Sequence, residues 1–382
     1  MKSFSTKGVK ISAKEGVRKA ILTLLKGMLQ KDCFDAILIP MRVPAEDSYA
    51  WILLRDKQFL DDANPIAPIM PVQGAKALRS YTRKGRGSLK IAAMMRPCEI
   101  RATIELSKLN QVHLENVTLL SYDCPGAMTF AEYLQDPVAG EKNFDSLLKA
   151  ADHEGESLKP VCRICEHFSI LPVCDLHFGL LGGDPDHILV IPNSEEGKRV
   201  LNDMELEISE DLTRWDRSVE ELKRKKEKQR AERFNEIKNM VEGFDRLADT
   251  FSECIGCHNC QNVCPVCYCR HCYFESEISK PDSDSILLKA KRRGGLSFPI
   301  DRVMFHVGRM SHMILSCVSC GLCSDACPVS IPVAETFSYV ADSTQRTFEY
   351  NSGEDGGEPL PMKTYHLEEI KGIKELVKEA EG

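Results

Sequence analysis

The sequence of 382 residues lacks long hydrophobic runs and an excess of positive charge. No apolar stretch reaches the about 18 residues that a membrane-spanning helix needs, and residues 1–10 are polar, so we expect neither membrane insertion nor an export signal. Lysine and arginine total 50 against 57 acidic residues, and no basic face for nucleic acid is evident. No G-x-G-x-x-G follows a strand, and no P-loop, Ser-His-Asp or paired-carboxylate pattern is present, which argues against nicotinamide binding by a Rossmann fingerprint and against common hydrolytic chemistry.

Cysteine, in contrast, is abundant, with 17 residues. An odd number fits poorly with complete disulfide pairing inside one chain. Metal ligation in a reducing compartment explains the number better, so we expect a cytoplasmic location.

Two cysteine runs share the pattern C-x2-C-x2-C-x3-C-P, which is the spacing by which bacterial ferredoxins hold two 4Fe-4S clusters. In that arrangement the fourth cysteine of each run ligates the other cluster. The sequence therefore predicts two ligand sets, cluster 1 with Cys254, Cys257, Cys260 and Cys327, and cluster 2 with Cys317, Cys320, Cys323 and Cys264.

The spacing has a mechanical reason. Three thiolates two residues apart wrap a loop around one face of a cluster, and the proline after the fourth cysteine, Pro265 or Pro328, ends the turn. A pair of zinc ribbons would need two isolated C-x2-C pairs for each metal and would leave the third and fourth cysteines unexplained.

The chain before these runs alternates helical and strand patterns. Residues 13–31 carry apolar side chains at i, i+3, i+4 and i+7, which predicts an amphipathic helix. Further strands and helices are predicted in turn, the strands at 34–40, 49–54, 89–95 and 117–122 and the helices at 74–81 and 98–109. This alternation predicts an α/β domain.

Cysteines outside the two runs lie in turns of this α/β part. Cys98 follows a predicted strand at the start of a helix, where the helix dipole favours a thiolate, and Cys124 follows the next strand. Cys162 and Cys165 form a C-x2-C pair, and Cys174 lies a little further on. Each could be a small buried residue, but as a set they favour a third metal site.

A long polar pattern at 215–243 predicts a charged helix between two domains, and a helix at 302–316 leads into the second cysteine run. The stretch after Ser352 is expected to be a flexible acidic loop, followed by a charged helix at 367–380. These patterns divide the chain into an α/β domain with the third metal site at 1–210, a charged helical connector at 211–250, a mainly α-helical ferredoxin-like domain with two 4Fe-4S motifs at 251–345, and a tail at 346–382.

Three more cysteines, Cys267, Cys269 and Cys272, follow the first run closely. They are either additional or alternative ligands, or buried reduced thiols. Their spacing does not separate these interpretations.

Several of these segments together resemble a known family. They are Arg96-Pro97-Cys98-Glu99-Ile100-Arg101-Ala102, Ile104-Glu105-Leu106, Asp123-Cys124-Pro125-Gly126, the pair Cys162 and Cys165 ahead of Asp175 and Gly179, and the cysteine-rich stretch from Cys264 to Cys272. The chain is similar here to the beta subunits of deazaflavin-coenzyme-reducing hydrogenase and formate dehydrogenase. The formate dehydrogenase branch, which carries the paired ferredoxin motifs, is the more similar.

The resemblance implies a flavoprotein subunit that exchanges a hydride for single electrons at FAD beside a 4Fe-4S cluster. It matches Cys98, Cys124, Cys162 and Cys165 to the cluster cysteines of that family and leaves Cys174 as a bystander or substitute ligand. It places the flavin near Gly16, Arg96 and Arg101. The chain departs from the family where Cys-Gly-Gly turns are common, with Lys14-Glu15-Gly16 and Cys124-Pro125-Gly126 in their place.

The sequence thus predicts an electron-transfer subunit of an oxidoreductase complex. Its expected partner is a catalytic redox subunit such as a formate dehydrogenase, a hydrogenase or a heterodisulfide-reductase-like flavoprotein. The alternative is a flavin-free iron-sulfur adaptor that connects two partners, and a stand-alone oxidoreductase is a further rival.

Overall fold

A computed structural model of the protein describes residues 6–150, 155–183, 186–296, 298, 301–361 and 363. Within these residues, eight strands form one mixed sheet with helices on both faces. The strands are β1 (Lys7–Ser12), β2 (Ala36–Arg42), β3 (Tyr49–Leu54), β4 (Ile91–Met94), β5 (Val117–Tyr122), β6 (Leu176–Gly179), β7 (His187–Pro192) and β8 (Glu210–Asp211).

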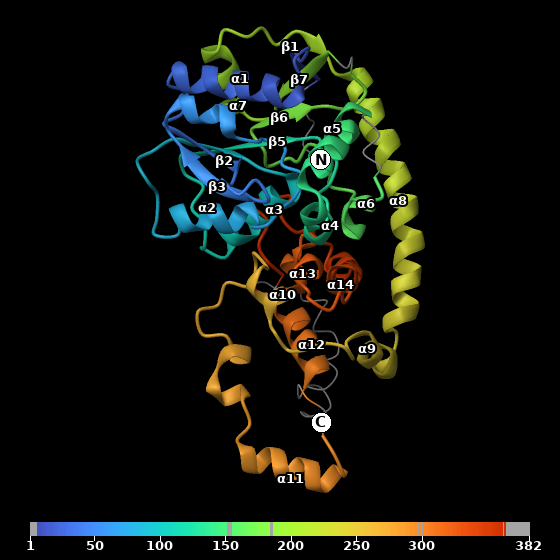
Figure 1. Cartoon of the computed structure of the whole chain (residues 1–382). Helices are drawn as coiled ribbons and strands as arrows, with labels where there is room; N and C mark the ends of the chain where they lie inside the picture. The colour runs from blue at the N-terminus through green and yellow to red at the C-terminus, as the bar shows by residue number, and fades with distance from the viewer. Residues whose placement is uncertain are drawn as a thin grey trace, which may run out of the picture.

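The helices fall into a group around the sheet and a group in the cysteine-rich half (Figure 1). The first group is α1 (Val17–Gln30), α2 (Gly74–Thr82), α3 (Pro97–Lys108), α4 (Phe130–Gln135), α5 (Pro137–Ala150), α6 (Pro160–Arg163) and α7 (Glu195–Asp203), with the 3-10 helix η1 (Lys57–Asp62). Then follow α8 (Thr213–Val241), α9 (Phe244–Thr250), α10 (Asn259–Asn262), η2 (Tyr273–Glu275), η3 (Glu277–Ser279), α11 (Ser283–Arg293), α12 (Arg302–Met313), η4 (Ile314–Ser316), α13 (Leu322–Asp325) and α14 (Val333–Thr347).

The sheet has the strand order β3-β2-β4-β5-β6-β7-β1-β8. The central strands β2, β4, β5 and β6 are parallel, whereas β3, β7, β1 and β8 join by antiparallel pairing. Because the carboxyl ends of parallel strands meet at one edge, the segments that follow β4 and β5 lie close together. Cys98 and Cys124 belong to these two segments.

Two apolar cores hold the helices to the sheet. Helix α1 buries Ile21, Leu25 and Met28 in the core on one face, while Leu78 of α2 and Ile100 of α3 belong to the core of the other. The apolar stripe of α1 and the fully buried β4 are the features that the sequence displays, and the α/β prediction is confirmed here. The predicted elements between residues 13 and 122 lie within a few residues of the observed ones.

Other strands escaped the sequence analysis. Strand β1 pairs with β7 from the far end of the domain, with Val9 opposite Val190, and β8 adds two residues at the edge. The pairing of β1 with β7 joins segments about 180 residues apart, and no local sequence pattern records such a pairing.

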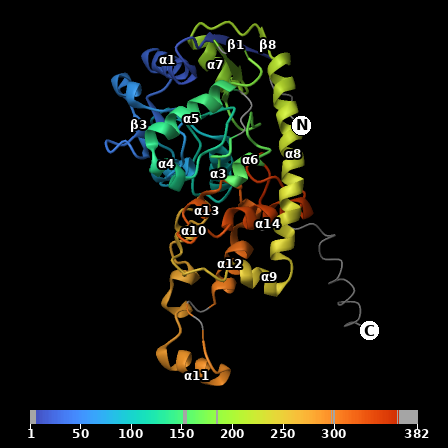
Figure 2. The same cartoon turned by 45° about the vertical axis from the view of Figure 1, so that its right-hand side comes forward.

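Helix α8 runs beside the molecule from the sheet to α9, so it connects the two halves (Figures 1 and 2). The sequence predicts a solvated connector, yet Lys226 and Arg230 are buried together with Trp215 and Phe234. The Lys226 ammonium donates to the carbonyl oxygen of Cys162 at 2.9 Å. This helix therefore packs against the loop that carries two of the predicted ligands.

The cysteine-rich half has its own apolar core, in which Phe251, Phe305 and Phe337 pack with cysteines of both runs. The described regular elements after β8 are all helical. Helix α11 stands away from the rest, and none of its described side chains is buried (Figure 1).

The segment after α14 turns back onto α3. Tyr350 donates to the carboxylate of Glu105, and the Gly353 amide donates to the same carboxylate at 2.8 Å. Ser352 and Leu360 are buried, so the start of the expected flexible loop is packed. The predicted helix at 367–380 lies outside the described residues.

Candidate metal centres

Four cysteines line one pocket at the end of the cysteine-rich half, and they are the four predicted for cluster 1: Cys254, Cys257, Cys260 and Cys327. The pocket encloses about 310 Å³ not filled by protein atoms. Cys260 is buried, whereas Cys257 is exposed to solvent. This centre therefore lies close to the protein surface.

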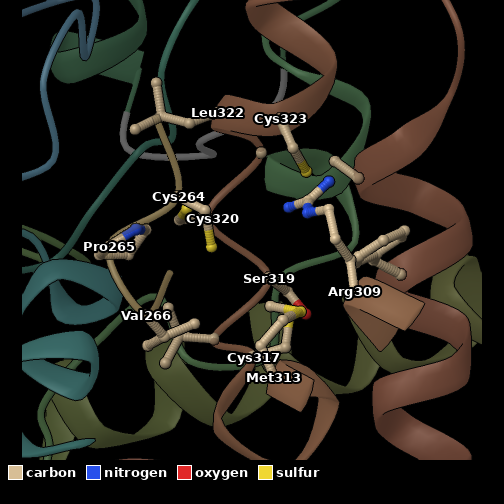
Figure 3. Close-up of a pocket in the computed structure, with 14 residues that line it drawn as sticks. Cys264, Pro265, Val266, Arg309, Met313, Cys317, Ser319, Cys320, Leu322 and Cys323 are labelled. Atoms are coloured by element: carbon tan, nitrogen blue, oxygen red, sulfur yellow. The ribbon is translucent and has the colours of Figure 1, made fainter. Parts of the chain in front are cut away.

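A second pocket, of about 410 Å³, is lined by the four cysteines predicted for cluster 2: Cys264, Cys317, Cys320 and Cys323. Figure 3 shows these side chains around the pocket, with the guanidinium of Arg309 reaching in beside Cys323. The exchange of the fourth cysteine between the two runs, which the spacing predicts, is thus reproduced in the way the pockets are lined.

The two cysteine loops repeat the same backbone conformation. The third residue of each run, Gly256 or Ser319, has a positive φ of 66° or 55°, and the fifth, His258 or Gly321, has 58° or 83°. Left-handed conformations at both positions curl the loop around its pocket.

Backbone amides of these loops donate to the cysteine sulfurs. The Cys317 sulfur accepts from the amide of Ser319, and the Cys320 sulfur accepts from Leu322. Such hydrogen bonds stabilise negative charge on sulfur, as a cluster ligand requires.

A third pocket, of about 420 Å³, lies between the sheet edge and the cysteine-rich half. Its lining includes the four cysteines predicted for a third cluster: Cys98, Cys124, Cys162 and Cys165. Gly126, with φ +115°, closes one side, because a Cβ there would lie 3.0 Å from the Cβ of Cys162. Glycine in the Cys124-Pro125-Gly126 turn thus permits the two cysteine segments to approach.

The three pockets form a row. Cys320 lines both the second and the third pocket. Arg309 lines the second pocket and donates to the sulfur of Cys260, which lines the first. The centre of cluster 2 therefore lies between the other two.

The pockets fit a polynuclear group better than a single ion. Among the described residues, no three His, Cys, Asp or Glu side chains are close enough to hold one metal ion. Burial raises the pKa of the Cys124 and Cys320 thiols to about 12, so binding of metal must displace their protons. Four thiols that line one pocket suit a 4Fe-4S cluster.

The sequence analysis missed a buried carboxylate next to a cysteine of the third pocket. Asp123 is fully buried beside Cys124 and accepts hydrogen bonds from five donors: the Ser169 hydroxyl, His177 Nε2, the Leu180 and Leu181 amides and Trp215 Nε1. Burial alone would raise the pKa of Asp123, but His177 and the hydrogen bonds from Ser169 and Trp215 lower it to about 2. Its position directly before a predicted ligand was the available signal.

The remaining cysteines differ in their surroundings. Cys33 and Cys174 lie in the apolar cores, and the Cys174 thiol donates to the carbonyl oxygen of Leu171 at 3.1 Å, which fits the bystander interpretation. Cys267 lines a separate pocket with two further cysteines, Cys269 and Cys272. The Cys267 thiol also bonds the Cys264 sulfur, which lowers the pKa of Cys264 and raises that of Cys267.

The three residues predicted for flavin are not brought together. Gly16 precedes α1 with φ +104° and lines neither of the pockets to which the two arginines contribute. Arg96 is buried, donates to the carbonyl oxygens of Ala67 and Ile69, and pairs with Glu99.

Arg101 is buried as well and donates to the backbone and side-chain oxygens of Ser352 at 2.8 and 2.9 Å. Both guanidinium groups therefore bind protein oxygens, and only the buried Nε of Arg96 has no hydrogen-bond partner among the described atoms. Because Gly16 lies apart from both arginines, the three residues do not form one flavin cradle, and we derive no step through FAD.

One protein family and several known proteins are similar to this chain. Residues 250–331 match the family described as "4Fe-4S dicluster domain", and this range contains the eight cysteines of the two runs. A dicluster domain of this kind therefore follows the N-terminal α/β domain in this chain.

Two curated relatives extend over almost the whole chain. The F420-dependent formate dehydrogenase subunit beta of Methanocaldococcus jannaschii is 27% identical, with 89% of this chain and 93% of the relative covered. F420-dependent formate dehydrogenase 1 subunit beta of Methanococcus maripaludis is also 27% identical, covering 89% and 92%. The predicted resemblance is confirmed: these beta subunits are homologues of the chain.

A chain from the F420-reducing [NiFe] hydrogenase complex of Methanosarcina barkeri is a weaker structural match. It has 12% identity and a TM-score of 0.45, and the match covers 61% of this chain and 93% of that one. In the part of the chain that the structure describes, no helix combines the length and apolar character needed to span a bilayer.

Proposed function

We propose that this chain is an electron-transfer subunit that conducts electrons along three 4Fe-4S clusters. The ligand sets are those predicted from the sequence, with the third cluster held by Cys98, Cys124, Cys162 and Cys165. The observation that carries the proposal is the row of three pockets, each lined by four of these cysteines, with Cys320 shared by two pockets. When bound, such clusters accept and release single electrons.

The chain's own residues define the two ends of this row. Cys257 is exposed, so the cluster 1 end is open to a partner, whereas Cys124 lies buried at the sheet edge. The relatives are named as subunits of F420-dependent formate dehydrogenase, which supports a catalytic redox subunit as the partner. A partner of the formate dehydrogenase, hydrogenase or heterodisulfide-reductase type would exchange electrons at the exposed end, in the cytoplasm where thiolate ligands persist.

The domain division proposed with this function places the boundary along α8. The α/β domain at 1–210 would supply the third cluster, the connector at 211–250 would hold the halves together, and the domain at 251–345 would carry clusters 1 and 2. The contact of Lys226 with the carbonyl oxygen of Cys162 supports a rigid arrangement of the halves.

The family resemblance adds FAD as the group that would convert a hydride into single electrons. A specific observation favours the flavin-free adaptor as the second candidate: Arg96 and Arg101 are occupied by protein oxygens. In the adaptor, a partner would carry out the hydride chemistry, and this chain would only transfer electrons between the partners.

Anaerobic measurement of iron, acid-labile sulfide and acid-released flavin on the isolated chain tests the proposal. About twelve irons per chain are expected for three clusters, and about eight would restrict the function to the dicluster domain. One FAD per chain would exclude the adaptor, and its absence from a chain with full iron would support the adaptor. Fewer than eight irons after reconstitution would contradict the electron-transfer function itself.

A further inference from the structure

Arg309 of α12 is a buried cation with sulfur partners from both cysteine runs. Its side chain is 2% exposed. One terminal nitrogen donates to the Cys260 sulfur at 3.1 Å and the other to the Cys260 carbonyl oxygen at 3.1 Å. The same side chain lines the pocket of cluster 2 beside Cys323, as Figure 3 shows.

The usual partner of a buried arginine is missing here. Among the described residues, no carboxylate lies within ion-pair distance of Arg309, although other buried cations such as Lys159 have one. A buried cation without a counter-ion would be strongly destabilising. The cysteine sulfurs are the compensation that the structure offers, since Cys260 accepts from Arg309 at 3.1 Å and four cysteines line the same pocket as Arg309.

One donor of this guanidinium is still unused. The Nε atom is buried and has no hydrogen-bond partner among the described atoms. Phe305 and Phe337 pack near the guanidinium, the latter with its ring centre 4.9 Å away, and exclude water from it. The charge of the guanidinium therefore acts on its neighbours across a low-dielectric interior from which water is excluded.

We propose that Arg309 is a positioning residue that sets the reduction potentials of clusters 1 and 2. The inference rests on the proposed function, because it requires both clusters. A cluster ligated by four thiolates becomes more negative by one charge on reduction, so a fixed cation nearby stabilises the reduced state and raises the potential. The hydrogen bond to Cys260 adds to this for cluster 1, whereas cluster 2 is influenced through charge alone.

Placement between two clusters lets Arg309 act on both of them. Reduction of one cluster still makes reduction of its neighbour harder, because like charges repel across a low-dielectric interior. The fixed cation raises both potentials, so both clusters can be reduced at a higher potential than they would be without Arg309.

The test is a potentiometric titration of the full-length chain, followed by electron paramagnetic resonance under anaerobic conditions. We expect Arg309→Gln to lower the potential of cluster 1 by about a tenfold change in its one-electron reduction equilibrium, which equals 59 mV. Cluster 2 should shift in the same direction by less. The signal lost in a Cys323→Ser chain belongs to cluster 2, and the signal lost in a Cys257→Ser chain belongs to cluster 1.

Two further variants separate charge, hydrogen bonding and stability. Arg309→Lys keeps the charge but loses the two-pronged contact with Cys260, so cluster 2 should remain near its wild-type potential while cluster 1 is lowered. Arg293→Gln removes an exposed charge at the end of α11 and should move neither potential.

Unchanged potentials in an Arg309→Gln chain that retains its iron would overturn the inference and leave the proposed function intact. If the glutamine variant loses iron, the lysine variant decides, and an unshifted cluster 1 there would refute the inference. Loss of cluster 1 from both variants would mean that Arg309 acts only in assembly, which also contradicts it. Wild-type protein without eight irons would instead contradict the proposed function.

Discussion

Replacement of Asp123 by asparagine is the sharpest test of how the α/β domain holds its cysteines. The carboxylate accepts from five donors, so each oxygen is surrounded by N–H or O–H groups. An asparagine oxygen can still accept hydrogen bonds from the Leu180 and Leu181 amides and from Trp215 Nε1. Its amino group must then face Ser169 and His177, which have to become acceptors.

The cost follows from the hydrogen bonds. A bond to a charged acceptor contributes about 1.5–3 kcal/mol and a bond between neutral groups about 0.5–1.5 kcal/mol, a difference of about 1 kcal/mol for each bond. Over three to five bonds the Asp123→Asn variant loses about 3–5 kcal/mol, similar to the cost of removing one partner of a buried ion pair. At about 2 °C per kcal/mol for a large domain, the apparent Tm falls by about 6–10 °C.

Protonation of Asp123 matters only in acid. The pKa of Asp123 is about 2 in the folded chain and 3.8 for a free aspartate side chain, so the carboxylate binds protons less readily when the chain is folded. Its stabilisation is therefore complete above a pH of about 4 and is lost as the pH falls through 2. Titration of Asp123 itself should thus contribute no difference between pH 6 and pH 8.

Anaerobic thermal unfolding at a single scan rate measures the change, and iron analysis shows whether the third centre is lost. Asp211→Asn is the matched control, because Asp211 is exposed and accepts only local bonds from Thr213. Its Tm should change by about 2 °C or less. A Tm for Asp123→Asn within 2 °C of wild type would refute the inference that the five hydrogen bonds to Asp123 stabilise the α/β domain.

Four further substitutions address the cysteine sets and the packing around them. Cys323→Ser should reduce the iron content by about four per chain, whereas Cys33→Ser in the apolar core should leave it unchanged, and full iron in the Cys323 variant would disprove its ligand role. Gly353→Ala should lower the apparent Tm, because φ is +74° and the new Cβ would overlap the backbone of α3; a wild-type Tm would contradict this contact. Lys226→Met should cost about 1–3 kcal/mol by removing the charged donor to the carbonyl oxygens of Cys162 and Arg163, and hydrogen exchange across residues 160–165 should rise, so unchanged exchange would argue against the α8 contact.

The sequence by itself determined the grouping of the eight motif cysteines. Cluster loops are local, because two-residue spacings confine three cysteines to one turn, and the fourth is placed by the short segment that follows. The α/β order could be predicted for a similar reason. The apolar stripe of α1 and the continuous apolar run of β4 are each formed by residues close together in the sequence. The carboxyl ends of parallel strands also placed Cys98 and Cys124 at one edge.

Only the tertiary structure decided how these local units relate to each other. The row of pockets depends on Cys320 facing two centres, and the bridging role of Arg309 depends on α12 packing between the two cysteine loops. The arginines expected at a flavin turned out to bind protein oxygens supplied by distant segments. Such contacts join residues far apart in the chain, and no periodicity or spacing encodes them, because they arise from the way preformed elements pack.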